Sequence, residues 1–290
     1  MKLYHNPLSS CSQKVRMVLH EKKLSWESQV IDLQKGEQFT ADYLALNPNA
    51  VVPTLEDQGH TVIESTLINE YLDDAYADIT LKPANANLRY QMRYLTRRID
   101  DALHGACGVI TYAIGVRPSL MSRPREEVDA LINKIPDPSR RETRRSVVQL
   151  GVQAPEFVAA LNIHSAVFDL AASFLQSQPW LAGESFSLAD CALMPYALRA
   201  DHLGLANEIS DRPALSRWYD AIRARPAFTD AVTAWLPEPA IAGFRAAGDA
   251  VANEICSLSS AMASAMVVIS PAMTSAATWA SCTALCANMG

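Results

Sequence analysis

The sequence lacks the features that mark several common classes of protein. Its 25 Lys and Arg residues do not exceed its 31 Asp and Glu residues, and the net charge of -6 leaves no overall basic surface for a nucleic-acid partner. Of its six cysteines, those before residue 257 have neither zinc-ribbon spacing nor a Cys-x-x-Cys pair. The six histidines form no His-Glu-x-x-His motif, so we expect no metal site. These absences favour a reduced protein that acts on small molecules.

Targeting segments and uninterrupted apolar runs are also missing. Residues 1–4 lead directly into a strand pattern, so we expect no signal peptide and a cytoplasmic location. Residues 257–290 carry no charged side chain, but serine, threonine and proline interrupt the apolar run that a membrane anchor needs. We interpret this segment as a low-complexity tail, either disordered or translated out of frame, and expect no membrane association. Cys282 and Cys286 within it are interpreted as incidental rather than as a metal-binding pair.

The remaining composition is that of a folded protein, with 49% hydrophobic and 19% charged residues, and the length of 290 residues indicates two domains. Strand and helix patterns alternate over residues 1–79 and include a hairpin with its turn at residues 57–59. Ser65 is expected to cap the helix that follows. This order predicts an α+β domain with a mixed sheet, joined to the rest by a linker at residues 80–86.

Residues 87–256 predict an all-helical domain. The expected helices cover residues 87–114, 155–176, 188–201, 212–224 and 227–235. Residues 116–154 are rich in proline and charge, which predicts a partly ordered insertion that is either a lid or a solvated loop. Ser187 and Asp190 match a helix-capping box, so we assign Asp190 a structural rather than a catalytic role.

The most informative polar cluster follows the first expected strand, at residues 6–16. Ser9, Ser10 and Cys11 lie where the first helix begins, and the amides and partial positive charge of a helix N-terminus favour an anion such as a thiolate. Two alternatives stay open. A serine here can serve only as the helix cap, and Cys11 can itself be a thiol of low pKa.

Two further segments indicate a site for a small peptide. Pro53 stands between strand-like residues, which indicates an edge or a cis turn that leaves the backbone of Val52 free to pair with an extended peptide. Glu64 and Ser65, at the start of the next helix, can bind an ammonium and a carboxylate. Together these segments predict a site for a peptide that carries an amine, carboxylates and a thiol.

In this combination the chain resembles the glutathione transferases over about residues 1–235. The matching segments are residues 9–16, 36–48, 52–55, 64–66 with 71–72, and 180–190. The resemblance implies a thioredoxin-like N-terminal domain followed by an all-helical domain, the glutathione transferase fold. It also implies glutathione as co-substrate or cofactor, a small hydrophobic electrophile as the second partner, and a homodimer.

The resemblance also assigns roles to residues. Ser9 resembles the serine that hydrogen-bonds the glutathione sulfur, and Ser10 and Cys11 are the alternatives at this position. The residues that would bind the rest of glutathione are Lys35, Gln38, Val52, Pro53, Glu64 and Ser65. The residues expected along the pocket for the electrophile are Tyr90, Tyr94, Arg97, His104 and Tyr112.

The implied activity is attack of the glutathione thiolate on a small hydrophobic or aromatic electrophile, in detoxification or in the catabolism of aromatic compounds. The substrate stays open. Residues 9–12 and 36–39 are similar to zeta-class members, which include maleylacetoacetate isomerases. Residues 132–136 are similar to bacterial β-aryl-etherases, and residues 49–55 with Cys11 are similar to reductive dehalogenases. A non-catalytic glutathione-binding or adaptor protein is the alternative of another class, but a scaffold has no physical need for a hydroxyl at the thiol position.

Overall fold

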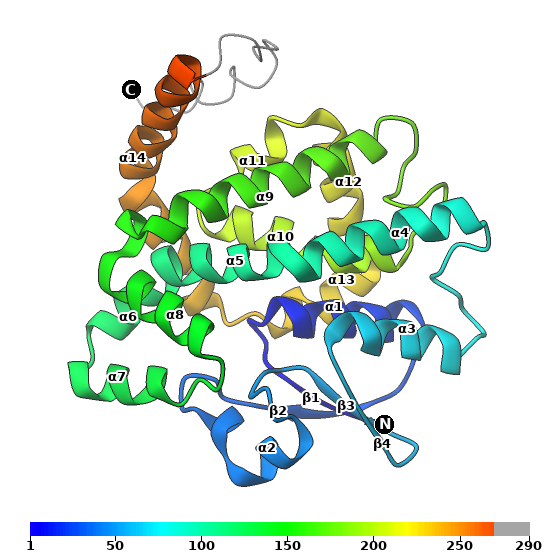
Figure 1. The fold of residues 1–290 in the computed structure, drawn as a ribbon. Coiled ribbons are helices and arrows are strands. Elements are labelled where there is room, and N and C mark those ends of the chain that lie inside the picture. Colours follow the sequence, from blue (N-terminus) through cyan, green and yellow to red (C-terminus); the bar gives the residue numbers. More distant parts are fainter. Residues whose placement is uncertain (270–290) are drawn as a thin grey trace.

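The computed structural model describes residues 1–269 and their side chains as far as residue 258. Figure 1 shows a small α/β layer formed by the N-terminal part of the chain, covered on one side by a larger helical domain. The two parts are the thioredoxin-like and all-helical domains that the sequence predicts.

The N-terminal domain is built on a four-stranded mixed sheet in the order β2-β1-β3-β4. Its strands are β1 (Lys2–His5), β2 (Glu27–Val30), β3 (Thr54–Asp57) and β4 (His60–Ile63). β1 pairs in parallel with β2 and antiparallel with β3, and β3 and β4 form the expected hairpin. The mixed sheet predicted from the sequence is therefore confirmed.

Helices cover this sheet on both faces. α1 (Ser10–Glu21) and α3 (Ser65–Ala75) lie between the sheet and the helical domain, and α2 (Ala41–Leu46) lies on the opposite side (Figure 1). A short 3-10 turn, η1 (Glu37–Phe39), precedes α2. Val15, Val18 and Leu19 repeat at helical spacing, and their complete burial against Leu55 of the sheet and Leu72 of α3 makes α1 a core element.

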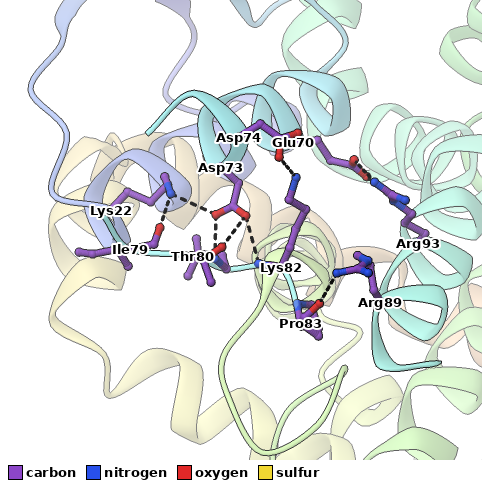
Figure 2. Close-up of polar contacts among 11 residues, drawn as sticks. Lys22, Glu70, Asp73, Asp74, Ile79, Thr80, Lys82, Pro83, Arg89 and Arg93 are labelled. Atoms are coloured by element: carbon purple, nitrogen blue, oxygen red, sulfur yellow. Dashed lines mark hydrogen bonds and ion pairs between the residues drawn. The ribbon is translucent and has the colours of Figure 1, made fainter. Parts of the chain in front are cut away.

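Charged side chains form polar contacts around the connection between the domains, as Figure 2 shows. The buried carboxylate of Asp73 accepts hydrogen bonds from the Lys22 ammonium at 3.1 Å and from the amide of Leu81 at 2.7 Å. Beside it, Arg93 forms a two-armed pair with Glu70 at 2.7 and 3.1 Å. The carbonyl of Leu81 also accepts the amide of Leu188 in the helical domain at 3.1 Å, so the predicted linker is hydrogen-bonded to both domains.

The helical domain begins with one long helical run that includes two π-helical turns. It consists of α4 (Ala86–Arg98), η2 (Ile99–Leu103), α5 (His104–Thr111), η3 (Tyr112–Val116) and α6 (Arg117–Met121). The π-helical turns η2 and η3 each add a residue to the turn and so rotate the side chains that follow. The helix expected over residues 87–114 therefore forms, and His104 emerges directly after the first wide turn.

The remaining helices pack behind this run. They are α9 (Pro155–Phe174), α10 (Leu188–His202), α11 (Asn207–Ser210), α12 (Pro213–Arg223), α13 (Pro226–Ala231) and α14 (Glu238–Ile269), with 3-10 turns η4 (Gly151–Gln153) and η5 (Thr233–Trp235). By length and composition alone α9 could cross a membrane, but it packs against α5, and Phe157 and Phe168 are completely buried. These properties fit a core helix of the domain.

The expectation of a partly ordered insertion was wrong. Residues 116–154 form α6, α7 (Arg125–Asn133) and α8 (Pro138–Leu150), which share a small apolar cluster of their own. Prolines that suggested a loop stand instead at helix starts: Pro118 and Pro138 occupy the first turn of α6 and α8, and Pro124 directly precedes α7. The lost amide of proline costs nothing at these positions, because it has no partner within the helix.

The structure also revises the boundary of the tail. α14 continues to Ile269, so the segment expected to be a tail from residue 257 begins as helix, while residues 270–290, with Cys282 and Cys286, lie outside the described part. α14 packs very closely on the end of α10, where a Cβ at Gly248 would collide with the carbonyl of Leu203. Glycine is required at that crossing.

Candidate active site

Ser9 lies at the start of α1 and is its N-cap residue. Its backbone is extended, and its hydroxyl oxygen accepts the amide of Ser12 at 3.2 Å. The capping role, one alternative from the sequence, is therefore confirmed. It uses only the oxygen as an acceptor, and among the described residues no group accepts a hydrogen bond from the Ser9 hydroxyl. That O–H is half-exposed and free to donate to an anion at the helix N-terminus.

Two buried arginines hold the loop that precedes Ser9. Arg16 donates to the carbonyls of Asn6 and Pro7, each at 3.2 Å, and Arg199 of α10 donates to the carbonyl of Leu8 at 2.5 Å. The loop that presents the hydroxyl is thereby fixed from both domains. No local pattern pointed to Arg199, because it lies 191 residues from Leu8 along the chain.

Ser10 differs from Ser9 in its surroundings, since Ser10 is buried and Ser9 is half-exposed. Burial raises the pKa of the Cys107 thiol, and a hydrogen bond with the Ser10 side chain partly opposes that effect. The Ser10 side chain therefore lies near the buried Cys107 thiol of α5. This geometry separates its role from that of Ser9.

The backbone around Val52 has the form expected of a peptide-binding edge. The Val52-Pro53 bond is cis, and in the described part of the chain neither the amide nor the carbonyl of Val52 has a hydrogen-bond partner. The preceding carbonyl, that of Val51, is satisfied instead by the Tyr43 hydroxyl at 2.6 Å and the Asn47 amide at 3.0 Å. The segment can therefore offer both backbone groups of Val52 to an extended ligand.

Glu64 and Ser65 open α3, but the cap is not the one expected. Glu64, not Ser65, occupies the N-cap position, and its φ of 68° is in the left-handed region that costs a non-glycine residue energy. Its carboxylate accepts from the Asn49 amide at 3.3 Å. Ser65 is the first residue of the helix, buried and adjacent to the Cys11 thiol, whose pKa its hydroxyl helps to lower.

The two residues expected at the glycine end differ in their surroundings. Lys35 is exposed and pairs with Asp32 at 3.3 Å. Gln38 is buried, and its Oε1 atom has no hydrogen-bond partner. A buried amide oxygen without a donor is costly, so Gln38 is the stronger candidate for a ligand contact. α7 of the insertion reaches this region, since a Cβ at Gly36 would contact Leu131 at 3.4 Å.

Cys11 contacts His104 across the boundary of the two domains. The distance from Sγ to Nδ1 is 3.5 Å, and the same Nδ1 lies 3.2 Å from the Tyr196 hydroxyl. Burial raises the pKa of the Cys11 thiol, but the charges of His104 and Lys14 outweigh it and bring the pKa to about 6. The thiolate in turn raises the pKa of His104. At Cys107 and Cys191, by contrast, burial raises the pKa of the thiol.

Other residues expected along the electrophile pocket lie further along the exposed side of the long helix. Tyr90 and Tyr94 are 69% and 42% exposed and stack on each other with ring centres 6.0 Å apart, and Arg97 pairs with Asp101. The structure brings only His104 of the set to Cys11. Tyr112 lies two turns beyond His104, and the Arg144 side chain of α8 packs over its ring. Whether any of these residues contacts an electrophile stays a prediction.

Comparisons with known proteins agree with this architecture. The family model described as "Glutathione S-transferase, N-terminal domain" matches residues 8–75, and "Glutathione S-transferase, C-terminal domain" matches residues 134–226. Glutathione S-transferase 3 of Zea mays is 32% identical over 244 residues, which cover 82% of this chain and 96% of that protein. The chain belongs to the glutathione S-transferase family.

Among its relatives are proteins with more specific names. Protein LigF of Sphingobium sp. is 29% identical over 241 residues, covering 79% of this chain and 92% of that protein. The crystal structure titled beta-etherase LigF, from strain SYK-6, superposes with a TM-score of 0.73 at 28% identity and covers 79% of this chain and 97% of that chain. A probable maleylacetoacetate isomerase 2 of Drosophila melanogaster is 26% identical, covering 78% of this chain and 85% of that protein. These relatives support membership of a family of glutathione-dependent enzymes.

Proposed function

We propose that this transferase binds glutathione between the Val52-Pro53 turn and the starts of α1 and α3, and holds its thiolate at Ser9. The observation that carries the proposal is the Ser9 hydroxyl, whose oxygen caps α1 while its proton stays available. Val52 would pair with the peptide backbone, and Glu64 and Ser65 would bind the γ-glutamyl group. Gln38 would use its unpaired Oε1 near the glycine end.

This arrangement favours the thiolate form of the bound thiol. A thiol with an ordinary pKa near 8.5 needs roughly 2.7 kcal/mol of preferential thiolate stabilisation to lower that pKa by about two units. One charge-assisted hydroxyl bond and a helix N-terminus together supply energy of this size. The thiolate then forms a bond from sulfur to an electrophilic carbon, and the leaving group departs with its electron pair.

For the electrophile we propose a small aromatic compound, with aryl ethers as the class to test first. The structural similarity to a protein titled beta-etherase supports this choice. We expect glutathione-dependent release of 4-nitrophenolate from a 4-nitrophenyl ether, followed by absorbance, and none when glutathione is omitted. Glutathione binding measured by calorimetry, without turnover of ethers or of a 2,4-dinitrophenyl halide, would favour the non-catalytic alternative.

A second candidate is chemistry at Cys11, as in the dehalogenase-like alternative. The observation that favours it is the contact of Cys11 with His104 at 3.5 Å, which stabilises a thiolate and an imidazolium together. In this alternative the Cys11 thiolate, and not only the hydroxyl of Ser9, takes part in the transfer.

The ionisation of Cys11 can be measured directly. We expect its alkylation by iodoacetamide, followed by mass spectrometry, to depend on pH with a midpoint near 6, where the pKa of Cys11 lies. His104→Gln removes the neighbouring positive charge, so it should move the midpoint upward. Lys14→Gln should move it by less, because the contribution of Lys14 is smaller. A parent midpoint above pH 8 would remove Cys11 from consideration as a reactive thiolate.

We propose that two copies of the chain form a dimer. Leu67 on α3 and Tyr90 on α4 are large apolar side chains with 61% and 69% of their surface exposed. Pairing of two copies through this face would cover them. A monomer mass in light scattering would contradict the dimer.

A further inference from the structure

Arg144 of α8 has no carboxylate partner in the part of the chain that the structure describes. Its guanidinium stacks over the Tyr112 ring with Cζ 2.9 Å from the ring centre, and its Nη1 atom is buried without a hydrogen-bond partner. Among the described residues no carboxylate pairs with Arg144, and no carbonyl accepts from it. Contact with a ring covers only a face of the guanidinium, because its N–H bonds point outward in the guanidinium's own plane. The Nη1 group, at the edge of that plane, has no acceptor among the described residues.

Three neighbouring arginines of the insertion have acceptors, whereas Arg144 has a buried nitrogen without one. Arg117 donates to the carbonyl of Val148, Arg141 to the carbonyl of Ile135, and Arg145 to Glu142. Burial lowers the pKa of Arg144. Tyr112 partly opposes this effect on the pKa, and the charge of Arg140 on the preceding turn adds to the lowering. Two cations close together, one of them desolvated, create a positive potential that an anion would relieve.

The position of Arg144 relates it to the proposed site of thiol chemistry. Tyr112, on which it stacks, follows His104 by eight residues on one helical run, a rise of about 12 Å. Gly105 and Gly108 lie on the intervening stretch, and a Cβ at either would meet no heavy atom within 4 Å. The helix surface between the Cys11 contact and Arg144 is therefore open at these two positions. Phe39, next to Gln38, packs with Tyr112 against the same apolar cluster, so the glutathione-binding domain adjoins this position.

We propose that Arg144 binds an anionic group, a carboxylate, on the aromatic electrophile. This inference rests on the proposed function and specifies its substrate class. The electrophile would lie along the open helix surface beside Gly105 and Gly108, with its carboxylate on the guanidinium edge and its reactive carbon toward the thiol near Ser9. The contact with Tyr112 restricts the guanidinium, whose N–H edge can form two parallel bonds to a carboxylate. The spacing of about 12 Å suits a molecule of roughly two aromatic rings.

The test uses a matched pair of substrates and a matched pair of variants. The substrates are a 4-nitrophenyl ether that carries a distal benzoate, and its neutral methyl ester. The variants are Arg144→Gln and Arg145→Gln, which remove the same charge from adjacent positions of α8. For Arg144→Gln we expect kcat/KM for the acid to fall about tenfold to a hundredfold, with the ester changed less than about twofold. Arg145→Gln should leave both values near those of the parent, and Arg144→Lys should restore part of the acid activity.

Binding is measured separately, so that the inference does not depend on turnover. Calorimetry with S-methylglutathione and an unreactive benzoate analogue should show binding in the parent that Arg144→Gln weakens about tenfold or more. If the parent binds the benzoate analogue but turns over neither ether, the proposed function is overturned and the anion site is not. The anion site is overturned if Arg144→Gln lowers kcat/KM equally for acid and ester. It is also overturned if Arg144→Gln leaves benzoate binding unchanged. Thermal unfolding of each variant shows whether a loss of activity merely reflects misfolding. If Arg144→Gln misfolds, the acid activity of Arg144→Lys tests the anion site in its place.

Discussion

Ser9→Ala is expected to lower kcat/KM for glutathione conjugation by about a hundredfold, the typical effect of removing one donor to a developing or bound anion. The hydroxyl proton that is free in the structure would be lost, and the bound thiol would return to its protonated form at neutral pH. The loss should diminish as the pH is raised, because the thiolate then forms without assistance. Steady-state kinetics between pH 6 and 9 measure both effects.

Capping and activation must be separated, since the same hydroxyl does both. Loss of the N-cap costs about 1 kcal/mol of stability, which urea unfolding will report. Ser9→Thr keeps the hydroxyl and should retain most activity, whereas Ser10→Ala removes an adjacent hydroxyl that faces Cys107 and should leave kcat/KM nearly unchanged. If Ser9→Ala conjugates at the parent rate at pH 6.5, Ser9 has no part in thiol activation.

Asp190→Ala is expected to destabilise the fold by about 4 kcal/mol, because several buried donors lose their only acceptor. The Asp190 carboxylate is fully buried, and it accepts the amide and hydroxyl of Ser187 at 2.8 and 2.7 Å. It also accepts the amide of Leu181 at 2.9 Å and the indole N–H of Trp218 at 2.8 Å. One side chain therefore caps α10 and ties it to α12 and to the segment before it.

The matched control is Asp220→Ala, the same substitution at a carboxylate that is 65% exposed and paired with Arg223. Exposed pairs of this kind contribute at most about 1 kcal/mol. Urea unfolding followed by tryptophan fluorescence compares the two variants with the parent. Equal small losses in both would show that the Asp190 network does not hold the domain together.

Local patterns in the sequence were sufficient for much of the fold. The α1 stripe of Val15, Val18 and Leu19, the hairpin turn and the capping box at Ser187 each depend on near neighbours, and each forms as expected. The insertion was misjudged because its prolines were interpreted as breaks. Apolar residues such as Val128 and Ile132 have the spacing of a helix face, and a proline in the first turn is compatible with that helix.

The candidate site was only partly predictable for a related reason. Ser9 and Val52 stand in recognisable local motifs, so their positions could be anticipated. The contact of Cys11 with His104 joins residues 93 positions apart, and it depends on where the π-helical turn before His104 directs the imidazole. The buried Nη1 atom of Arg144 without an acceptor is likewise visible only in the tertiary structure. Periodicity cannot supply tertiary juxtapositions of this kind.

The central claim, that Ser9 holds glutathione as a thiolate, is tested most directly by the near-ultraviolet thiolate absorbance of the bound tripeptide. The titration is done on the Cys11→Ala background, so that the signal belongs to glutathione and not to Cys11. The account predicts a thiolate band at pH 7 whose titration midpoint lies about two units below that of free glutathione, and its loss on adding Ser9→Ala. A bound thiol that titrates like the free tripeptide, or a band that survives Ser9→Ala, would contradict it.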